Sequence, residues 1–251
     1  MKIVVIGGTG LIGSKLVNRL RQLDHTVIPA SPESGVNTIT GEGLNEVLKD
    51  AHKVIDVSNS PSFEDKAVME FFQKSTMNLL TAEEYNGVKC HVALSIVGAD
   101  RLPKSGYLRA KVAQEELIKE SGLHYSILRS TQFFEFAARI AKDATTGNNV
   151  HISSAAFQPI ASDGVVAALA DIAVGPSLNA TVEIGGPVRM PMAEFIRYYL
   201  TATGDSREVI ADENALYYGT ELNDKSLVPG ENARLGKIKY EDWLSTQLVK
   251  A

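Results

Sequence analysis

The chain has 251 residues, of which 44% are hydrophobic and 22% charged, and its formal net charge at pH 7 is -5. This composition excludes a disordered chain, and the negative charge argues against binding to nucleic acid. The single cysteine, Cys90, excludes an internal disulfide and a zinc site built from several cysteines, and the five histidines lack the spacing of metal ligands. We therefore expect a small-molecule partner and no metal.

The first predicted strand begins at residue 2, and the chain has neither a secretory signal pattern nor a long apolar span. These features predict a soluble cytoplasmic protein without a membrane partner. Residues 1–251 contain no linker, repeat or low-complexity segment. We therefore predict a single domain, in which residues from about 131 onward contribute the substrate region. The sequence leaves open whether the protein is a monomer or a homodimer.

The first thirteen residues, MKIVVIGGTGLIG, combine an apolar strand pattern at 3–6 with a glycine-rich turn, and a helical pattern follows at 15–23. The glycines fit G-x-G-x-x-G and also G-x-x-G-x-x-G. Such a turn lets backbone N–H groups approach a pyrophosphate, and the helix start adds partial positive charge. A tight turn that binds nothing is the alternative. We predict a dinucleotide site with contacts from Gly7, Thr9, Gly10, Leu11, Ile12 and Gly13.

The second predicted strand, 25–30, ends where the chain selects between NAD and NADP. An acidic residue there would bind the ribose 2′-OH of NAD and repel the 2′-phosphate of NADP. The chain instead continues with Ser31 and Ser34, whose hydroxyls suit a phosphate, although Glu33 lies between them and no arginine is near. The pattern favours NADP, with NAD as the alternative, and the two serines also fit an ordinary loop.

A short helix is predicted at 44–50, and the next strand, 53–58, ends at Ser58 and Asn59, where a ribose or the nicotinamide would pass. A long helix at 63–80 and a strand at 91–96 follow.

Tyr107 and Lys111 are four residues apart in a helix-forming run, so their side chains share one face. A lysine ammonium beside a phenol lowers the pKa of the tyrosine and makes it a usable proton donor. Ser95, twelve residues upstream at the end of a strand, is placed to hold a substrate oxygen. Tyr85 and Lys89 have the same interval, but Asn86-Gly87 between them predicts a turn. We therefore predict Ser95, Tyr107 and Lys111 as the catalytic set, with surface residues as the alternative.

A strand at 125–128 leads into Thr131, which we expect to contact the cofactor, and into the substrate residues Gln132, Phe133 and Phe134. Clustered phenylalanines are also typical of a core, which is the alternative for two of the three at 133, 134 and 136. The remaining predicted elements are a strand at 158–160, a helix at 164–174 with Asp163 as its N-cap, a strand at 182–184 and a helix at 193–203. The loop at 223–236 is either a lid or an ordinary surface loop.

With these residues in view, the chain resembles the short-chain dehydrogenase/reductase superfamily, and more narrowly its atypical, NmrA-like branch. The resemblance rests on GGTGLIG at 7–13, SIVG at 95–98, YLRAK at 107–111, SGLHYSILRSTQFFEF at 121–136, QPIASDGVVAAL at 158–169 and EIGGP at 183–187. It implies a Rossmann-type α/β fold with a doubly wound, mainly parallel sheet and a small C-terminal substrate-binding portion. It further implies that Ser95, Tyr107 and Lys111 match the catalytic serine, tyrosine and lysine. In that scheme Tyr107 is the general acid and Lys111 also contacts the nicotinamide ribose.

The chain departs from the family pattern at two positions. Ser130 stands where the family commonly has proline, and Ala30-Ser31 stands where many relatives carry a basic residue. Many NmrA-like relatives lack the tyrosine and act as redox-sensing regulators, so the retained Tyr107 favours an enzyme. We expect an NAD(P)H-dependent oxidoreductase acting on a small carbonyl or quinone-like substrate. The alternatives are a non-catalytic NAD(P) sensor and a nucleotide-sugar epimerase or dehydratase.

Overall fold

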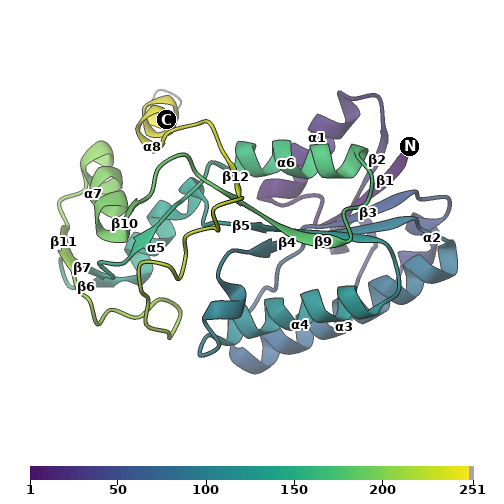
Figure 1. Cartoon of the computed structure of the whole chain (residues 1–251), viewed down its shortest axis with the longest axis horizontal. Helices are drawn as coiled ribbons and strands as arrows, with labels where there is room; N and C mark the ends of the chain where they lie inside the picture. The colour runs from purple at the N-terminus through teal and green to yellow at the C-terminus, as the bar shows by residue number, and fades with distance from the viewer. Residues whose placement is uncertain (249–251) are drawn as a thin grey trace. The chain divides into compact units, whose positions relative to one another are not determined.

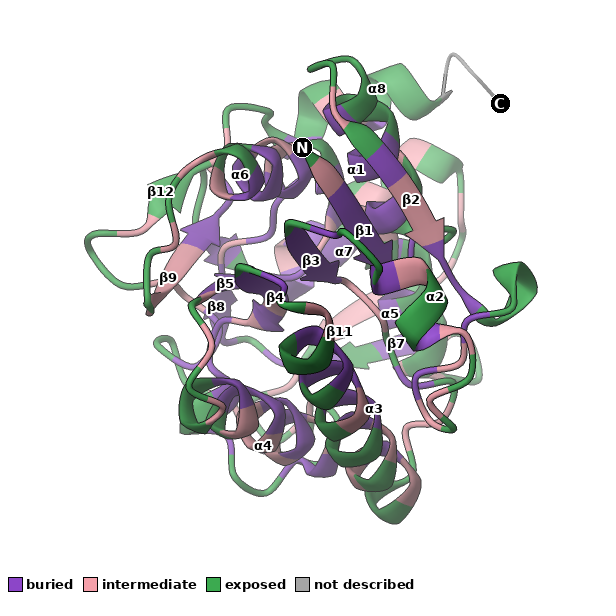
Figure 2. Cartoon of the chain, turned by 90° about the vertical axis from the view of Figure 1, so that its right-hand side faces the viewer, coloured by how far each residue is buried: buried purple, intermediate pink, exposed green. Residues whose placement is uncertain are grey.

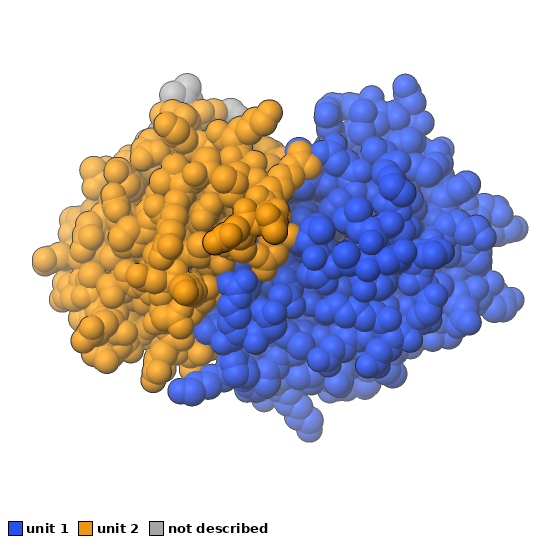
Figure 3. All heavy atoms as spheres, viewed as in Figure 1, with its two compact units in different colours: residues 1–129, 165–182 blue, residues 130–164, 183–251 orange. Residues whose placement is uncertain are grey.

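The computed structural model describes residues 1–248, which form two compact units. The first unit comprises residues 1–129 and 165–182, and the second comprises residues 130–164 and 183–251 (Figure 3). The second unit thus begins next to the point from which the sequence predicts the substrate region. A compact unit is not in itself an independently folding domain, so the single domain stays a prediction.

The first unit is built on parallel strands. Its strands are β1 (Lys2–Ile6), β2 (Thr26–Ala30), β3 (Lys53–Asp56), β4 (Cys90–Ile96) and β5 (Tyr125–Ser130), and β9 (Ala180–Gly185) begins in it. With β12 (Arg234–Leu235) beside the end of β9, the sheet has seven strands in the order β12-β9-β5-β4-β3-β1-β2. The expected mainly parallel, doubly wound sheet is confirmed. The strand order reverses at β1, which pairs with β2 on one side and with β3 on the other.

The apolar run at the start of the chain forms β1, which lies inside the sheet with a parallel neighbour on each side. Ile3, Val4 and Val5 are fully buried, and Figure 2 shows most of β1 in the colour of buried residues. Val4 packs in one cluster with Val54 of β3 and Leu79. A strand that is apolar on both faces is stable only between two layers of helices. The glycine turn therefore follows the carboxyl end of β1, the strand at which the strand order reverses.

Helices cover both faces of this sheet. They are α1 (Leu11–Arg21), α2 (Leu44–Leu48), α3 (Asp65–Asn86), α4 (Gly106–Glu120) and α6 (Ser162–Val174), with short 3₁₀ turns at Pro32–Ser34 and Ala99–Arg101. Figure 1 shows α3 and α4 side by side on one face and α1 and α6 on the other. Helix α3 is longer than predicted and ends where Gly87 takes a left-handed conformation, φ +67°. The predicted turn between Tyr85 and Lys89 is therefore confirmed.

The second unit has smaller sheets around an aromatic core. Phe134, Phe195 and Tyr240 are almost fully buried and contact one another, and Trp243 packs on Phe134 and Tyr240. Its elements are η3 (Phe134–Phe136), α5 (Ala137–Asp143), β6 (Thr145–Thr146), β7 (Asn149–Ile152), β8 (Ala156–Phe157), β10 (Met190–Pro191), α7 (Met192–Thr203), β11 (Glu208–Ala211) and α8 (Tyr240–Leu248).

Two local predictions for this region need correction, and the structure bears on one alternative that the sequence left open. The strand predicted at 158–160 is wrong, because the strand lies at Ala156–Phe157 and Ile160 makes only an isolated bridge. Helix α6 begins at Ser162, whose backbone N–H and hydroxyl both donate to Glu135, so Asp163 lies in the first turn and is not the N-cap. The loop 223–236 is held by the fully buried Leu227 and by β12, which favours the surface loop over the lid.

Within the described part of the chain, 1–248, none of the helices has the length and apolarity that crossing a membrane requires.

Candidate functional site

The turn between β1 and α1 needs glycine at several positions. Gly7 has φ +75°, and a Cβ on it would lie 2.9 Å from the backbone of Ser58. A Cβ on Gly13 would lie 2.1 Å from the carbonyl oxygen of Gly7. Helix α1 starts after Gly10. Among the described residues, 1–248, no side chain caps this helix start, and its first turn contains no acidic residue. Its uncapped N–H groups and positive dipole end suit an anion such as a pyrophosphate, which is the role predicted for residues 7–13.

The end of β2 is tied to this turn, because the backbone N–H groups of Gly7 and Gly8 both donate to the carbonyl of Ala30. The hydroxyl of Ser34 accepts a hydrogen bond from the backbone N–H of Ser31 and donates to the Ser31 carbonyl, each at 2.9 Å. The hydroxyl of Ser31 is buried and has no hydrogen-bond partner among the described residues. Of the two predicted serines, Ser31 therefore has the hydroxyl that is available to a ligand.

The end of β3 connects the glycine turn to α4. Asp56 is buried and accepts hydrogen bonds from the backbone N–H of Ser58 at 2.9 Å and from its hydroxyl at 2.6 Å. The side-chain oxygen of Asn59 accepts from the Ser60 backbone N–H at 3.0 Å and from the Tyr107 hydroxyl at 2.9 Å. The predicted cofactor residues Ser58 and Asn59 thus lie between the predicted pyrophosphate cradle and the predicted general acid.

Tyr107 lies in the first turn of α4 and is half-buried. Its ring packs against Phe63, with ring centroids 5.3 Å apart, and against the edge of Phe72 at 6.1 Å. Lys111, one turn later, places its ammonium 4.4 Å from the centroid of the same Phe72 ring. Tyr107 and Lys111 therefore share the face of α4 that packs on α3.

Lys111 is 3% exposed, and its ammonium donates to the Leu94 carbonyl at 2.9 Å and to the side-chain oxygen of Gln114. Burial lowers the pKa of Lys111 to about 8, while the negative charges of Asp56 and Glu115 oppose this shift. A pKa of about 8 keeps the side chain mainly protonated at pH 7, and it loses its proton in mildly basic solution.

Ser95 is 2% exposed and donates its hydroxyl proton to Glu115 at 2.6 Å. Arg129 donates to both oxygens of Glu115 at 2.8 Å and to Asp100 at 2.7 Å. Burial opposes ionisation of Glu115, but the hydrogen bonds from Arg129 and Ser95 outweigh it and hold the pKa of Glu115 below its usual value. A hydroxyl has one proton, so Ser95 can donate to a substrate oxygen only after it releases Glu115.

The other predicted residues lie in the second unit. Thr131 and Gln132 are nearly buried, and the Thr131 hydroxyl and the Gln132 side-chain oxygen have no partner within residues 1–248. Because an unpaired buried polar atom costs about 1–3 kcal/mol, a ligand that pairs with these atoms would be favoured. Phe133 packs on the exposed Phe136 with a centroid distance of 5.2 Å, whereas Phe134 takes the core alternative in the aromatic cluster.

Sequence reasoning missed four residues that the fold brings to this site. Gln114 and Glu115 follow Lys111 by three and four positions on the same helix, which is a signal that could have identified them. Asp56 lies on β3 and Arg129 on β5, far from Lys111 in the sequence, so no local spacing connects them to the site. Over residues 1–248, no three His, Cys, Asp or Glu side chains are grouped so that they could hold a metal ion.

Comparison with known proteins gives matches of three kinds. A family model described as NAD(P)H-binding matches residues 7–172. The photosystem II assembly factor Ycf39 of Synechocystis sp. (strain ATCC 27184 / PCC 6803 / Kazusa) is 26% identical in an alignment of 149 positions that covers 54% of this chain and 46% of the relative. The chain therefore spans about half the length of the curated relatives that it matches.

Solved structures share the fold over the whole chain. MoeE5 in complex with UDP-glucuronic acid and NAD has a TM-score of 0.80 at 20% identity, covering 99% of this chain and 98% of its own. The dTDP-4-dehydrorhamnose reductase of Bacillus anthracis in complex with NADP has a TM-score of 0.76 at 15% identity, covering 100% and 99%. At these identities the likeness concerns the fold alone.

Proposed function

Because the chain belongs to the NAD(P)H-binding family, with the atypical short-chain dehydrogenase/reductase type of fold, we propose that it is an NAD(P)H-dependent oxidoreductase acting on a small carbonyl or quinone-like substrate. One arrangement in the first unit carries the proposal. The backbone of Ser58 touches the glycine turn at Gly7, and the next residue, Asn59, holds the Tyr107 hydroxyl at 2.9 Å. A proton donor thus lies beside the place where the family binds its cofactor.

The residues of the glycine turn fit the dinucleotide, because the N-terminus of α1 has no side-chain cap and its N–H groups suit a pyrophosphate. Glycine at 13 lets α1 pack closely against the backbone of the turn. Residues 7–13, Ser58 and Asn59 would hold it, with Ser31 at the adenosine end and Thr131 as the predicted contact from the second unit. When bound, the cofactor supplies a hydride. The unpaired Ser31 hydroxyl and the lack of an acid at 30 and 31 favour NADP, with NAD as the alternative.

In the proposed reduction the substrate C=O bond becomes a C–H and an O–H bond, and the cofactor is oxidised. Tyr107 gives its proton to the substrate oxygen, and the ammonium of Lys111 stabilises the phenolate that forms. Ser95 contributes by donating to the same oxygen once its hydroxyl leaves Glu115. Gln132 and Phe133 are the proposed substrate contacts, whereas Phe134 lies in the aromatic core.

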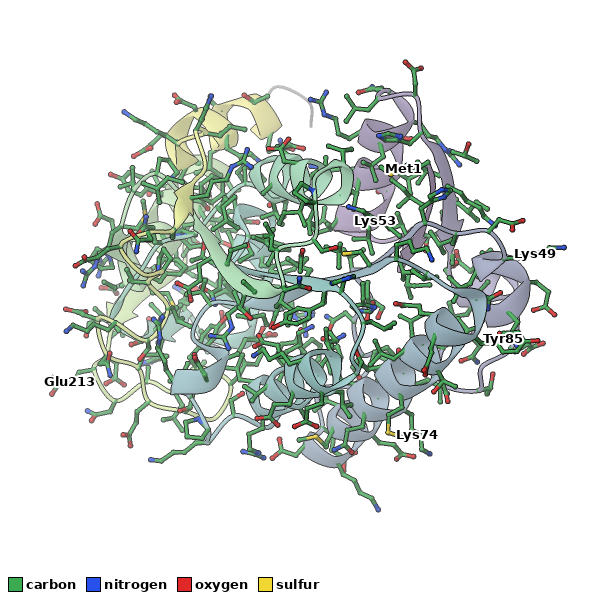
Figure 4. The ribbon with its side chains drawn as sticks, turned by 45° about the vertical axis from the view of Figure 1, so that its right-hand side comes forward. Met1, Lys49, Lys53, Lys74, Tyr85 and Glu213 are labelled. Carbon is green, nitrogen blue, oxygen red and sulfur yellow. The ribbon has the colours of Figure 1, made fainter. Side chains whose placement is uncertain are left out.

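The test begins with titration of the protein with NADPH and NADH by fluorescence, followed by a panel of aldehydes, ketones and quinones at the nicotinamide absorbance band. Tyr107→Phe should lower turnover at least about 100-fold, which is the usual contribution of general acid catalysis, and leave cofactor affinity unchanged. The matched control is Tyr85→Phe, because Tyr85 is 81% exposed at the outside of α3 (Figure 4). Turnover that survives in Tyr107→Phe would refute the role of Tyr107.

A second candidate is a non-catalytic NAD(P)-binding protein that acts through a partner. It is favoured by the curated relatives, which are named photosystem II assembly factors, and by the engagement of Ser95 with Glu115. Cofactor binding with no oxidation by any panel compound would support it. The epimerase or dehydratase alternative draws only on a likeness of fold, since the MoeE5 structure with a nucleotide sugar is 20% identical.

A further inference from the structure

A chain of hydrogen bonds runs from Lys111 through Gln114 and Asp56 to Ser58, which lies beside the glycine turn. Asp56, Gln114 and Lys111 are 2%, 2% and 3% exposed. The side-chain oxygen of Gln114 accepts from the ammonium of Lys111, and its amide nitrogen donates to Asp56 Oδ2 at 2.9 Å. The other oxygen of Asp56 binds Ser58, whose backbone lies against Gly7.

The chemistry of the two end groups explains why an amide stands between them. An ammonium only donates hydrogen bonds, and an ionised carboxylate only accepts them. An amide offers one acceptor and two donors on a rigid plane, so it can serve both groups at once. An apolar side chain of similar length, such as that of methionine, would donate no hydrogen bond to the carboxylate and would accept only weakly from the ammonium. The amide has one orientation that satisfies both neighbours.

The surroundings of Lys111 make this bridge important. The charged and titratable groups around it are Asp56 on β3, Glu115 and Tyr107 on α4, and His91 on β4, which pairs with Glu83 of α3 at 2.8 Å. Burial opposes the charged form of Lys111. A loss of the Gln114 acceptor therefore leaves the buried ammonium with fewer hydrogen bonds.

We propose that Gln114 is a positioning residue, which holds the ammonium of Lys111 on the Tyr107 face of α4 by linking it to the carboxylate of Asp56. Its consequence for catalysis rests on the proposed function of Lys111. The link itself is a property of the protein without cofactor and can be measured there.

The direct test follows the Cε chemical shift of Lys111 against pH by NMR in the cofactor-free protein. Lys111→Arg identifies the signal by its loss. In Gln114→Met the titration midpoint should fall by about one pH unit, the equivalent of one lost hydrogen bond to a charged group. In Gln114→Glu it should stay at the wild-type value or rise, because a carboxyl also accepts from the ammonium.

The controls separate positioning from general loosening of the structure. Gln73 is exposed on α3, and Gln73→Met and Gln73→Glu should leave the midpoint of Lys111 unchanged. If Gln114→Met does not fold by circular dichroism, Gln114→Leu removes the same acceptor and should also lower the midpoint. An unchanged midpoint in Gln114→Met or Gln114→Leu, or an equal fall in Gln114→Met and Gln114→Glu, would overturn the proposal.

If the protein turns over a substrate, the basic limb of its kcat–pH profile should move with the NMR midpoint in each variant. If the protein has no turnover but the Lys111 midpoint shifts in Gln114→Met, the missing turnover counts against the proposed enzyme. The shifted midpoint still supports the positioning role of Gln114.

Discussion

The hydroxyl of Tyr107 donates a 2.9 Å hydrogen bond to the side-chain oxygen of Asn59, which lies 48 positions earlier at the end of β3. The backbone N–H of Ser60 donates to the same oxygen at 3.0 Å, so it fixes the orientation of the Asn59 amide. Its NH₂ group is therefore directed away from Ser60 and is a candidate donor to an oxygen beside Tyr107.

Asn59→Ala should lower kcat about tenfold, because one hydrogen bond worth about 1.4 kcal/mol no longer holds the Tyr107 hydroxyl. The affinity for NADPH, measured by fluorescence, should change less than kcat. Asn148→Ala is the control, because Asn148 is exposed in the turn between β6 and β7. A normal kcat in Asn59→Ala would show that Tyr107 does not depend on this contact.

Gly13→Ala should destabilise the protein by about 1–3 kcal/mol, measured by urea unfolding, because its Cβ would lie 2.1 Å from the Gly7 carbonyl oxygen. Gly10→Ala is the matched variant from the same turn, since its Cβ would lie 3.4 Å from that oxygen and its φ is -76°. We expect Gly10→Ala to keep its stability and to bind cofactor more weakly. Equal stability of the two variants would contradict the steric argument.

Ser31→Asp should reverse the proposed cofactor preference. A carboxylate at the end of β2 repels a 2′-phosphate and accepts hydrogen bonds from a ribose hydroxyl, so the ratio of NADPH to NADH affinity should fall at least about tenfold. Ser206→Asp adds the same charge at an exposed position of the second unit and should leave the ratio unchanged. Retention of the NADPH preference in Ser31→Asp would place the 2′-phosphate elsewhere.

Glu115→Gln should cost about 3–5 kcal/mol of unfolding free energy at pH 7, because it leaves the Arg129 guanidinium with a neutral partner inside the protein. The pKa of Glu115 is lower in the folded protein than in the unfolded chain, where it is about 4.3. Its contribution is therefore complete above the unfolded pKa and disappears as pH falls through the folded pKa. The difference between wild type and Glu115→Gln should shrink in acid, as urea unfolding at several pH values would measure.

The control for this change is Glu70→Gln, which removes an exposed pair with Lys74 on α3 and should leave the stability unchanged at every pH. A difference between wild type and Glu115→Gln that grows as the pH falls would reverse the sign argued for Glu115.

Patterns within short segments of the chain were enough to predict the order of the strands and helices and the catalytic candidates. The apolar run at 3–6, the glycines after it and the helix that follows all lie within about twenty residues, and they predicted a strand buried on both faces and the turn after it. Tyr107 and Lys111 could be paired for the same reason, since the period of one helix fixes which side chains share a face. Asn86-Gly87 likewise predicted the turn that separates Tyr85 from Lys89.

Contacts between distant segments depended on the packing of the whole chain. Three sets of hydrogen bonds join α4 to segments far away in the sequence. Tyr107 pairs with Asn59, Gln114 pairs with Asp56, and Glu115 pairs with Ser95 and Arg129. No periodicity in the sequence indicates which of these residues meet. Phe133 and Phe134 are adjacent and chemically identical, yet only Phe134 lies in the aromatic core. Hydrophobicity and spacing are properties of a segment, whereas burial and hydrogen-bond partners are set by the segments that fold against it.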